Sequence, residues 1–283
     1  MAKAQAVLGV DLGGTNVRAG ILAGDRLGEI RSARIDARAS ADEVFERVCS
    51  AIDACRPDPF TAIGIGVPSL VDAERGIAYD TLNIPGWTEF PLKGRLEQRY
   101  RVPASVNNDA NCFILGEKRF GRGKPYRTLA GLTLGTGLGG GLIIDGKLHA
   151  GRLGGAGEFG MVPYRDRFVE YYAAGQFFRN VHGVSGEEAA ARAAAGDAAA
   201  LAMFREYGVH LGNAIQVVLH AVDPEIVILG GSVSREFRFF EAGMRESLAT
   251  FAYPRVVKSL KIEVSELPNA GLMGAAALCL ENP

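Results

Sequence analysis

The stretch GVDLGGTNVRAG, residues 9–20, breaks an apolar run at Gly13-Gly14-Thr15-Asn16 and then resumes it. Residues 6–12 and 17–22 are therefore predicted to be two short strands joined by a glycine turn. The turn is either a plain hairpin or a loop that lets a phosphate approach the backbone. Glycines permit positive φ and close approach, and successive N–H groups in such turns form an anion-binding concavity.

A similar pattern lies 122 residues further on, in LAGLTLGTGLGGGLIIDGKLHAG, residues 129–151. At this offset the pairs Gly9 and Gly131, Leu12 and Leu134, Gly13 and Gly135, and Ile21 and Ile143 are identical. Both segments read as a strand, a glycine turn and a strand, which favours two lobes related by a diverged duplication. Two such turns, one in each lobe, are suited to clamp a nucleotide, with Thr15 and Thr136 adding hydroxyl donors.

Several other kinds of protein are disfavoured. Neither turn matches GxxxxGK[ST], and the first lacks GxGxxG and runs into a strand, so a Walker loop and a dinucleotide fold are not expected. The net charge of −1 gives no sign of the basic surface that nucleic-acid binding requires. No apolar run reaches the roughly 18 residues of a membrane span, and the N-terminus lacks a signal peptide, so a cytoplasmic protein is expected. Four scattered cysteines are predicted to be buried free thiols.

The remaining segments mix strands and helices, which indicates an α/β fold. Residues 40–55 are predicted to be an amphipathic helix, with Ser40 as N-cap and Glu43 completing a capping box. Further helices are expected at 91–99, 108–121, within 168–222 and at 270–280, and further strands at 27–35, 61–70, 102–107, 225–231 and 260–267.

Asp11 stands at the end of the first predicted strand, directly before the glycine turn. A carboxylate beside a phosphate cradle is repulsive unless a cation lies between them. Mg²⁺ suits this position because it binds through one or two carboxylates plus phosphates and keeps water ligands. The alternative is that Asp11 only caps the turn through an Asx hydrogen bond.

Five motifs occur in order along the chain: DLGGTNVRAG, NNDAN, LTLGTGLGGGLI, GAGEFG and PEIVILGGSVS. Together they resemble the ROK family of sugar kinases, in the actin-like ATPase superfamily, from residue 7 to about 277. The resemblance implies two α/β, ribonuclease H-like lobes with a central cleft, and a homodimer. Residues 1–112, with the C-terminal helix 271–283, would form the sugar and phosphate lobe, and residues 113–270 the nucleotide-binding lobe.

The resemblance also implies roles for individual residues. Asp109 would be the general base, which needs to be ionised and well aimed, although it could instead be only an N-cap. Asn108, Asn83 with the IPGW turn, Glu158 and Glu170 would bind sugar hydroxyls, while Trp87 could equally be core. The nucleotide would be held by Gly13, Gly14, Thr15, Asn16, Gly135, Thr136, Gly137, Gly230 and Gly231, with Asp11 binding Mg²⁺ through water.

The chain departs from the family at its zinc site. The family carries a His after its GE-x-G motif and a CxCGxxGC cluster, whereas here Met161 follows GEFG and residues 150–181 hold no Cys or His. Zinc is therefore not expected. Packing of Phe159, Tyr164, Phe168, Tyr171 and Tyr172 is predicted to order the 160–175 loop instead. Since the family His also contacts the sugar near C1 and C2, Met161 leaves the choice of hexose open.

The function implied is an ATP-dependent, Mg²⁺-requiring hexose kinase that transfers the γ-phosphoryl group, with glucose as first choice. N-acetylglucosamine, N-acetylmannosamine and other hexoses are alternatives, as is polyphosphate in place of ATP. A non-catalytic sugar sensor or regulator is the alternative of another class. A repressor is disfavoured, because the first glycine turn begins by residue 11 and leaves no room before it for a helix-turn-helix.

Overall fold

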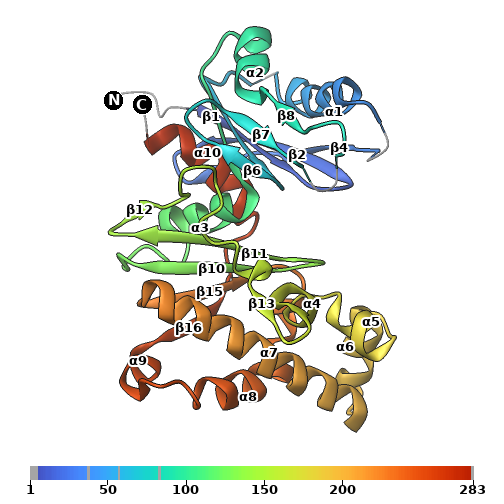
Figure 1. The fold of residues 1–283 in the computed structure, drawn as a ribbon. Coiled ribbons are helices and arrows are strands. Elements are labelled where there is room, and N and C mark those ends of the chain that lie inside the picture. Colours follow the sequence, from blue (N-terminus) through green and yellow to red (C-terminus); the bar gives the residue numbers. More distant parts are fainter. Residues whose placement is uncertain (1–5, 37–38, 57, 82–83, 282–283) are drawn as a thin grey trace. The chain divides into compact units, whose positions relative to one another are not determined.

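The computed structural model describes residues 6–36, 39–56, 58–81 and 84–281 (Figure 1). The chain divides into two compact units. Unit 1 comprises residues 1–125, 148–156 and 266–283, and unit 2 comprises residues 126–147 and 157–265. Each unit is built around its own mixed sheet.

The sheet of unit 1 grows from the hairpin that surrounds the first glycine turn. Strand β1 (Ala6–Leu12) pairs antiparallel with β2 (Asn16–Ala23) and parallel with β5 (Ala62–Val67), which pairs parallel with β9 (Ala104–Asn108). Two short strands, β3 (Arg26–Leu27) and β4 (Arg31–Arg34), pair with β2, where a single strand over 27–35 was expected. A separate small sheet contains β6 (Leu70–Asp72), β7 (Ile77–Tyr79) and β8 (Glu89–Phe90).

The sheet of unit 2 repeats this arrangement. Strand β10 (Leu129–Leu134) pairs antiparallel with β11 (Leu138–Ile144) and parallel with β15 (Ile226–Gly230), which pairs parallel with β16 (Lys261–Val264). The short β12 (Lys147–Leu148) completes the order β12-β11-β10-β15-β16. The order matches β3-β2-β1-β5-β9, and the pairings among β11, β10, β15 and β16 have the same sense as those among β2, β1, β5 and β9, so the shared architecture expected from the offset of 122 residues is confirmed.

Helix α1 (Ala41–Asp53) follows the sequence prediction closely. The Ser40 side chain accepts from the Glu43 backbone N–H, and the Glu43 carboxylate accepts from the Ser40 N–H, which completes the capping box. Val44, Val48 and Ile52 are fully buried on one face, as their spacing predicts.

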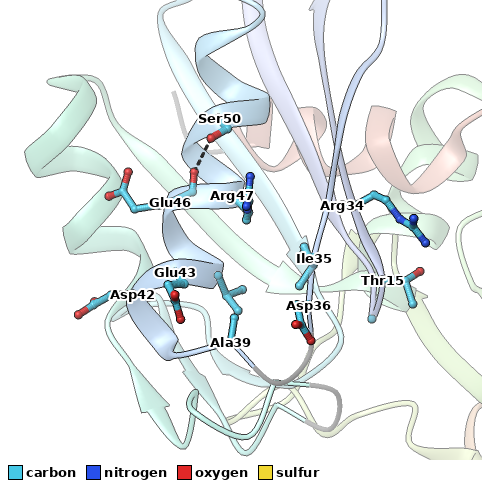
Figure 2. A pocket seen from close by; sticks show the side chains of 12 residues that line it. Thr15, Arg34, Ile35, Asp36, Ala39, Asp42, Glu43, Glu46, Arg47 and Ser50 are labelled. Carbon is cyan, nitrogen blue, oxygen red and sulfur yellow. Dashed lines mark hydrogen bonds between the residues drawn. The ribbon is translucent and has the colours of Figure 1, made fainter.

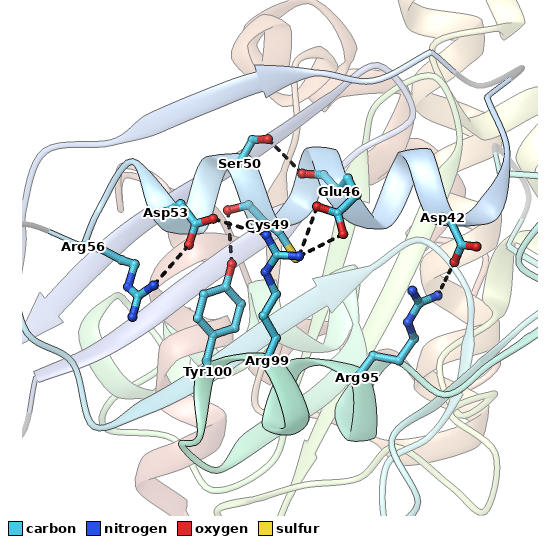
Figure 3. A network of polar contacts seen from close by, with 9 residues as sticks. All are labelled: Asp42, Glu46, Cys49, Ser50, Asp53, Arg56, Arg95, Arg99 and Tyr100. Carbon is cyan, nitrogen blue, oxygen red and sulfur yellow. Dashed lines mark hydrogen bonds and ion pairs between the residues drawn. The ribbon is translucent and has the colours of Figure 1, made fainter.

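Helix α2 (Leu92–Tyr100) lies alongside α1 (Figure 3). Arg99 reaches Glu46 at 2.8 Å, and the Tyr100 hydroxyl donates to the Cys49 carbonyl at 3.2 Å. Exposed ion pairs of this kind contribute about 0–1 kcal/mol each, so apolar burial does more to hold the helices. Trp87 belongs to that core: it is fully buried, stacks on Phe90 with ring centroids 4.2 Å apart, and its indole N–H donates to the Ala41 carbonyl.

Helix α3 (Asp109–Phe120) packs against α10 (Ala270–Glu281) through glycines. A Cβ on Gly274 would lie 1.7 Å from the Cys112 carbonyl oxygen, and a Cβ on Gly116 would lie 2.1 Å from that of Ala270. This close packing keeps α3 in unit 1. The expected lobe boundary at residue 112 therefore falls inside a helix, and the compact unit continues to residue 125.

Unit 2 buries its sheet under helices. They are α4 (Val169–Ala173), α5 (Phe177–His182), α6 (Gly186–Ala194), α7 (Ala198–Val222), α8 (Phe237–Leu248) and α9 (Pro254–Ser259), with short 3-10 turns at Phe159–Met161 and Val233–Glu236. Helices α7 and α8 approach closely at Gly208 and Gly243, where a Cβ would meet backbone within 2.1 Å. Across the described ranges, no helix combines the length and apolarity that a membrane span needs.

Candidate functional site

The carboxyl ends of β1, β5 and β9 gather the chemical groups of unit 1. These strands are parallel, with Asp11 paired to Gly66 and Gly66 to Asn107, so Asp11 and Asp109 follow the same edge of the sheet. Both carboxylates lie near enough to the Cys112 thiol to affect its pKa. Burial raises that pKa most, and the negative charges of Asp109 and Asp11 raise it further. The structure thus brings the two carboxylates and the first glycine turn to one sheet edge.

Asp109 is the first residue of α3, and its neighbour Asn108 is the N-cap. The Asn108 side-chain oxygen accepts from Ala110 N–H at 2.9 Å and Asn111 N–H at 3.3 Å, while its amide nitrogen donates to the Ser69 carbonyl. The alternative that Asp109 is only an N-cap is therefore wrong. Asn108 is 7% exposed and much of its bonding capacity serves the helix start, whereas Asp109 is half-buried and its Oδ1 accepts from Ala110 N–H.

The first glycine turn is closed by a bond from Gly13 N–H to the Asn16 carbonyl at 2.9 Å. Gly13 and Gly14, both within the described ranges, lie outside the left-handed region, so positive φ is not why this turn needs glycine. The other reason for glycine that the sequence analysis gave is that a phosphate can approach the backbone closely where no side chain stands in the way. Thr15 and Asn16 are exposed at the tip of the turn, and their side chains hydrogen-bond at 3.1 Å.

Asp11 is paired with Arg18, which lies opposite it on β2. Arg18 Nη2 lies 2.5 Å from Asp11 Oδ2, and Nη1 donates to Asn269 Oδ1 at 3.1 Å. The Asp11 side chain is 23% exposed. The cross-strand register places Arg18 on the carboxylate. Asp11 is therefore held by an ion pair, and among the described residues no Asx hydrogen bond runs from it to the turn.

A cavity of about 950 Å³ opens beside the first turn, between β4 and α1 (Figure 2). Gly14 and Thr15 line one side, and α1 contributes Glu46 and Arg47. Acidic and basic side chains are mixed around it, so its charge does not single out an anionic or a cationic ligand.

The second glycine turn, residues 135–137, is held by hydrogen bonds on two sides. Gly135 N–H bonds to the Gly137 carbonyl at 3.0 Å, and Gly175 N–H donates to the Gly135 carbonyl at 2.8 Å. On the other side, Glu170 Oε2 accepts from Leu138 N–H at 2.8 Å. A Cβ on Gly137 would lie 2.5 Å from that same oxygen, so glycine is what allows the carboxylate to approach.

A cavity of about 510 Å³ adjoins this turn within unit 2. Gly135 and Thr136 line it, together with two groups that the sequence analysis did not single out, one drawn from residues 175–190 and the other from residues 232–236. Gly231 precedes the second group with φ of +86°, and a Cβ there would meet the Leu134 carbonyl oxygen at 2.4 Å. Gly230 ends β15 and is buried. Within residues 175–190, Gly175 in the sequence AAGQ could have indicated that the backbone of this segment lies close to the glycine turn.

Glu158 and Glu170 lie close enough to interact electrostatically. Burial raises the pKa of the Glu158 carboxyl, and the charge of Glu170 raises it further. Carboxylates in such a pair are suited to accept several hydrogen bonds from one polyhydroxylated ligand, because each oxygen has two lone pairs. Met161, where the family carries His, is 48% exposed nearby in the sequence and offers only a weak acceptor.

The loop before Glu170 is ordered by aromatic rings around His210. A hairpin of β13 (Pro163–Tyr164) and β14 (Arg167–Phe168) carries Tyr164, whose hydroxyl lies 3.1 Å from His210 Nδ1. Tyr172 packs on both Tyr164 and His210, with ring centroids at 5.7 and 5.0 Å. The predicted aromatic packing is therefore present, but His210, which the sequence does not link to these rings, lies at its centre.

Phe168, predicted as part of this cluster, is 39% exposed and does not share in the core. Its position at the end of a short hairpin strand turns it toward solvent. Asn83, predicted as a sugar ligand, lies outside the described residues. Within the described ranges, no three His, Cys, Asp or Glu side chains gather to hold a metal, and all four cysteines are buried free thiols, as predicted.

His210 makes the stability of unit 2 sensitive to acid. Its side chain is fully buried, and burial and then the charge of Arg165 lower its pKa below the usual 6.5, against the opposing effect of Glu206, whose Oε1 lies 3.7 Å from Nε2. The unfolded chain therefore binds the proton first, so the free energy of unfolding is expected to fall as pH drops below about 6.5, by at most about 1.4 kcal/mol per pH unit from this group.

Urea unfolding from pH 5 to 8 measures this effect, with His210→Phe as the comparison. Phenylalanine keeps a ring in the cluster but cannot titrate. The variant should show a shallower loss of stability below about pH 6.5 than the parent chain, and equal slopes would contradict the assignment.

Comparisons with known proteins agree with this geometry. The family model described as "ROK family" matches residues 7–282. The chain is 32% identical to a glucokinase of Thermotoga maritima, over 97% of each chain, and 30% identical to an N-acetyl-D-glucosamine kinase of Mannheimia succiniciproducens, over 96% of this chain and 98% of that one. It superposes with a TM-score of 0.84 on a ROK family glucokinase from Streptomyces griseus, solved with glucose and AMPPNP, at 30% identity and covering 96% and 98% of the two chains. The α/β fold is thus that of the actin-like ATPases, and the chain belongs to the ROK family of proteins.

Proposed function

We propose that the protein is an ATP-dependent hexose kinase that transfers the γ-phosphoryl group of ATP to a hydroxyl of glucose, giving glucose 6-phosphate and ADP. The observation that carries the proposal is the edge of the unit 1 sheet, where a glycine turn, Asp11 and Asp109 come together. The glucokinase relatives and the glucose complex of a ROK family neighbour support glucose as the substrate.

Asp109 is the proposed general base. The attacking sugar oxygen forms its bond to the γ-phosphorus while the bond from that phosphorus to the ADP oxygen breaks, and the hydroxyl proton passes to an Asp109 carboxylate oxygen. Its place at the start of α3 favours the ionised form that accepts the proton, because the helix N-terminus carries partial positive charge. Phosphoryl transfer depends mainly on positioning and charge neutralisation, so aim matters more than basicity.

Glu158 and Glu170 are the proposed acceptors for sugar hydroxyls, and Asn108 and Asn83 the further sugar ligands. Asn108 has little free hydrogen-bonding capacity, since its side-chain oxygen caps α3 and its amide nitrogen donates to the Ser69 carbonyl. Its proposed contribution is therefore to place Asp109, with a single remaining amide hydrogen for the sugar.

The proposed nucleotide ligands are the turn residues Gly13–Asn16 and, in unit 2, the turn 135–137 and the cavity beside it. Gly230 and Gly231 would lie against the adenosine. Mg²⁺ fits this arrangement as an ion carried by the nucleotide: the Asp11 side chain is partly exposed, and Arg18 pairs with its Oδ2 oxygen. Asp11 would hold it through water, and the ion would neutralise charge on the phosphates.

The substitution Glu158→Gln is expected to weaken glucose binding without lowering the stability of the protein. The folded state raises the Glu158 pKa, so ionisation costs stability as pH rises through that value, and the neutral amide removes the cost. At pH 7 the variant should be as stable as the parent or more so. The KM for glucose should rise about tenfold or more, because a hydrogen bond to a charged acceptor is lost.

Thermal unfolding and initial-rate kinetics on the same preparations measure both effects. Glu188→Gln, on the exposed first turn of α6, is the matched control and should alter neither value. A lower Tm together with an unchanged KM for Glu158→Gln would contradict the role given to Glu158.

The proposed function is tested by following ADP release from Mg-ATP with glucose, N-acetylglucosamine, mannose, N-acetylmannosamine, fructose and allose. Turnover mainly on glucose supports the proposal. Turnover mainly on an acetylated sugar would support the second candidate, which the N-acetyl-D-glucosamine kinase relative favours, and would mean that Met161 leaves room for the acetyl group. No turnover on any sugar would contradict the kinase assignment.

A further inference from the structure

Glu170 engages two different parts of unit 2 with its two carboxylate oxygens. Oε2 accepts from Leu138 N–H at 2.8 Å, at the point where the second glycine turn enters β11. Oε1 accepts from the side-chain amide of Gln176 at 3.3 Å. The residue proposed to bind the sugar is therefore already tied to the turn proposed to hold phosphate.

Gln176 extends this link into the nucleotide cavity. It lines the 510 Å³ cavity together with Gly175, Gly135 and Thr136. Gly175 donates to the Gly135 carbonyl at 2.8 Å, and its Cβ position would lie 2.6 Å from that oxygen, so the backbone before Gln176 lies directly on the turn. A continuous set of contacts thus runs from Glu170 through Gln176 to the cavity.

Each carboxylate oxygen accepts two hydrogen bonds, so Glu170 has capacity for sugar hydroxyls while it keeps both existing bonds. A sugar bound there would fix the carboxylate, and with it Leu138 N–H and the Gln176 side chain. Fixing groups that a second ligand must otherwise order makes the second binding event more favourable. By linkage the effect is reciprocal for the two ligands.

We propose that Gln176 is a positioning residue that couples sugar binding at Glu170 to nucleotide binding at the 135–137 turn. The inference rests on the proposed function, since it takes Glu170 as a sugar ligand and the cavity as the nucleotide site. Its consequence is that glucose tightens the binding of nucleotide, and nucleotide the binding of glucose, by the same factor.

The test is isothermal titration of the whole chain with AMPPNP and Mg²⁺, in the absence and presence of saturating glucose. For the parent chain, glucose should lower the Kd of AMPPNP about fivefold or more. In Gln176→Leu, which removes the donor and keeps the bulk, this factor should fall below about two. In Gln176→Lys, which supplies an N–H donor to Glu170 again, most of the coupling should return.

Arg179→Leu is the matched control, because Arg179 lines the same cavity on the next turn of chain and makes no contact with Glu170 in the described structure. It should change the Kd of AMPPNP alone and leave the coupling factor at the parent value. A coupling factor in Gln176→Leu equal to that of the parent would overturn the proposal, and so would two ligands that bind the parent chain independently. Failure of the proposed function looks different, since glucose or AMPPNP would then not bind even singly.

Discussion

Asparagine at position 109 is expected to lower kcat by about 10²- to 10⁴-fold, because the amide cannot take the proton from the attacking hydroxyl. The change is nearly isosteric, and Asn108 remains to cap α3 through Ala110 and Asn111. The lost negative charge in the first helical turn should cost only about 0.3–1 kcal/mol of stability. Single-turnover rates and thermal unfolding, measured on the same protein, separate the two effects.

The matched control is Asp197→Asn, which makes the same change at the start of α7. Asp197 caps that helix by accepting from Ala200 N–H, and asparagine caps about as well as aspartate, so the rate should stay at the parent value and stability should fall only by what the ion pair with Arg192 contributes. A kcat for Asp109→Asn within a few-fold of the parent would remove Asp109 from the chemistry.

The substitution Gly274→Ala is expected to destabilise unit 1 severely. The new Cβ would lie 1.7 Å from the Cys112 carbonyl oxygen and 2.7 Å from the Gly116 nitrogen, both of them backbone atoms in α3. Backbone must therefore shift, and we expect a cost of about 3 kcal/mol or more, at or beyond the upper end for overpacked cores. Since Asp109 begins α3, residual folded protein should also have a lower kcat. Urea unfolding and kinetics measure the two losses.

Gly271→Ala in the same helix is the control. A Cβ at residue 271 would meet no atom within 4 Å, and alanine favours helix by up to about 1 kcal/mol over glycine. This variant should be as stable as the parent or slightly more so. Equal stabilities for the two alanine variants would show that close packing of α10 on α3 does not hold the helix that carries Asp109.

Local sequence patterns were sufficient to predict most of the fold. The glycine turn between apolar strands predicted the β1–β2 hairpin, and its offset copy predicted β10–β11. The Ser40 and Glu43 spacing predicted the start of α1 because a capping box is a contact between near neighbours. The strand expected over 27–35 is split in two because its register against β2 shifts by one residue: Leu22 pairs with Leu27, but Ala19 pairs with Arg31, which leaves one extra residue between β3 and β4, as in a β-bulge.

Long-range contacts explain what the sequence did not predict at the candidate site. Arg18 meets Asp11 only because the hairpin register places them opposite each other, and Asn269, which also binds Arg18, is 251 residues away. His210 lies 46 residues from Tyr164 and looked like an ordinary helix residue until the fold placed it under the hairpin. The hydrogen bond from Leu138 N–H to the Glu170 carboxylate joins residues 32 positions apart, so no local sequence pattern indicates it.

The most direct test of the central claim is to identify the product formed from ATP, Mg²⁺ and glucose by the parent chain, using ³¹P NMR. We predict that glucose 6-phosphate and ADP appear in equal amounts, with glucose saturating at or below about 1 mM as is usual for enzymes, and that Asp109→Asn forms neither at a comparable rate. Inorganic phosphate in place of a sugar phosphate, or no consumption of ATP with glucose or any other hexose, would contradict the account.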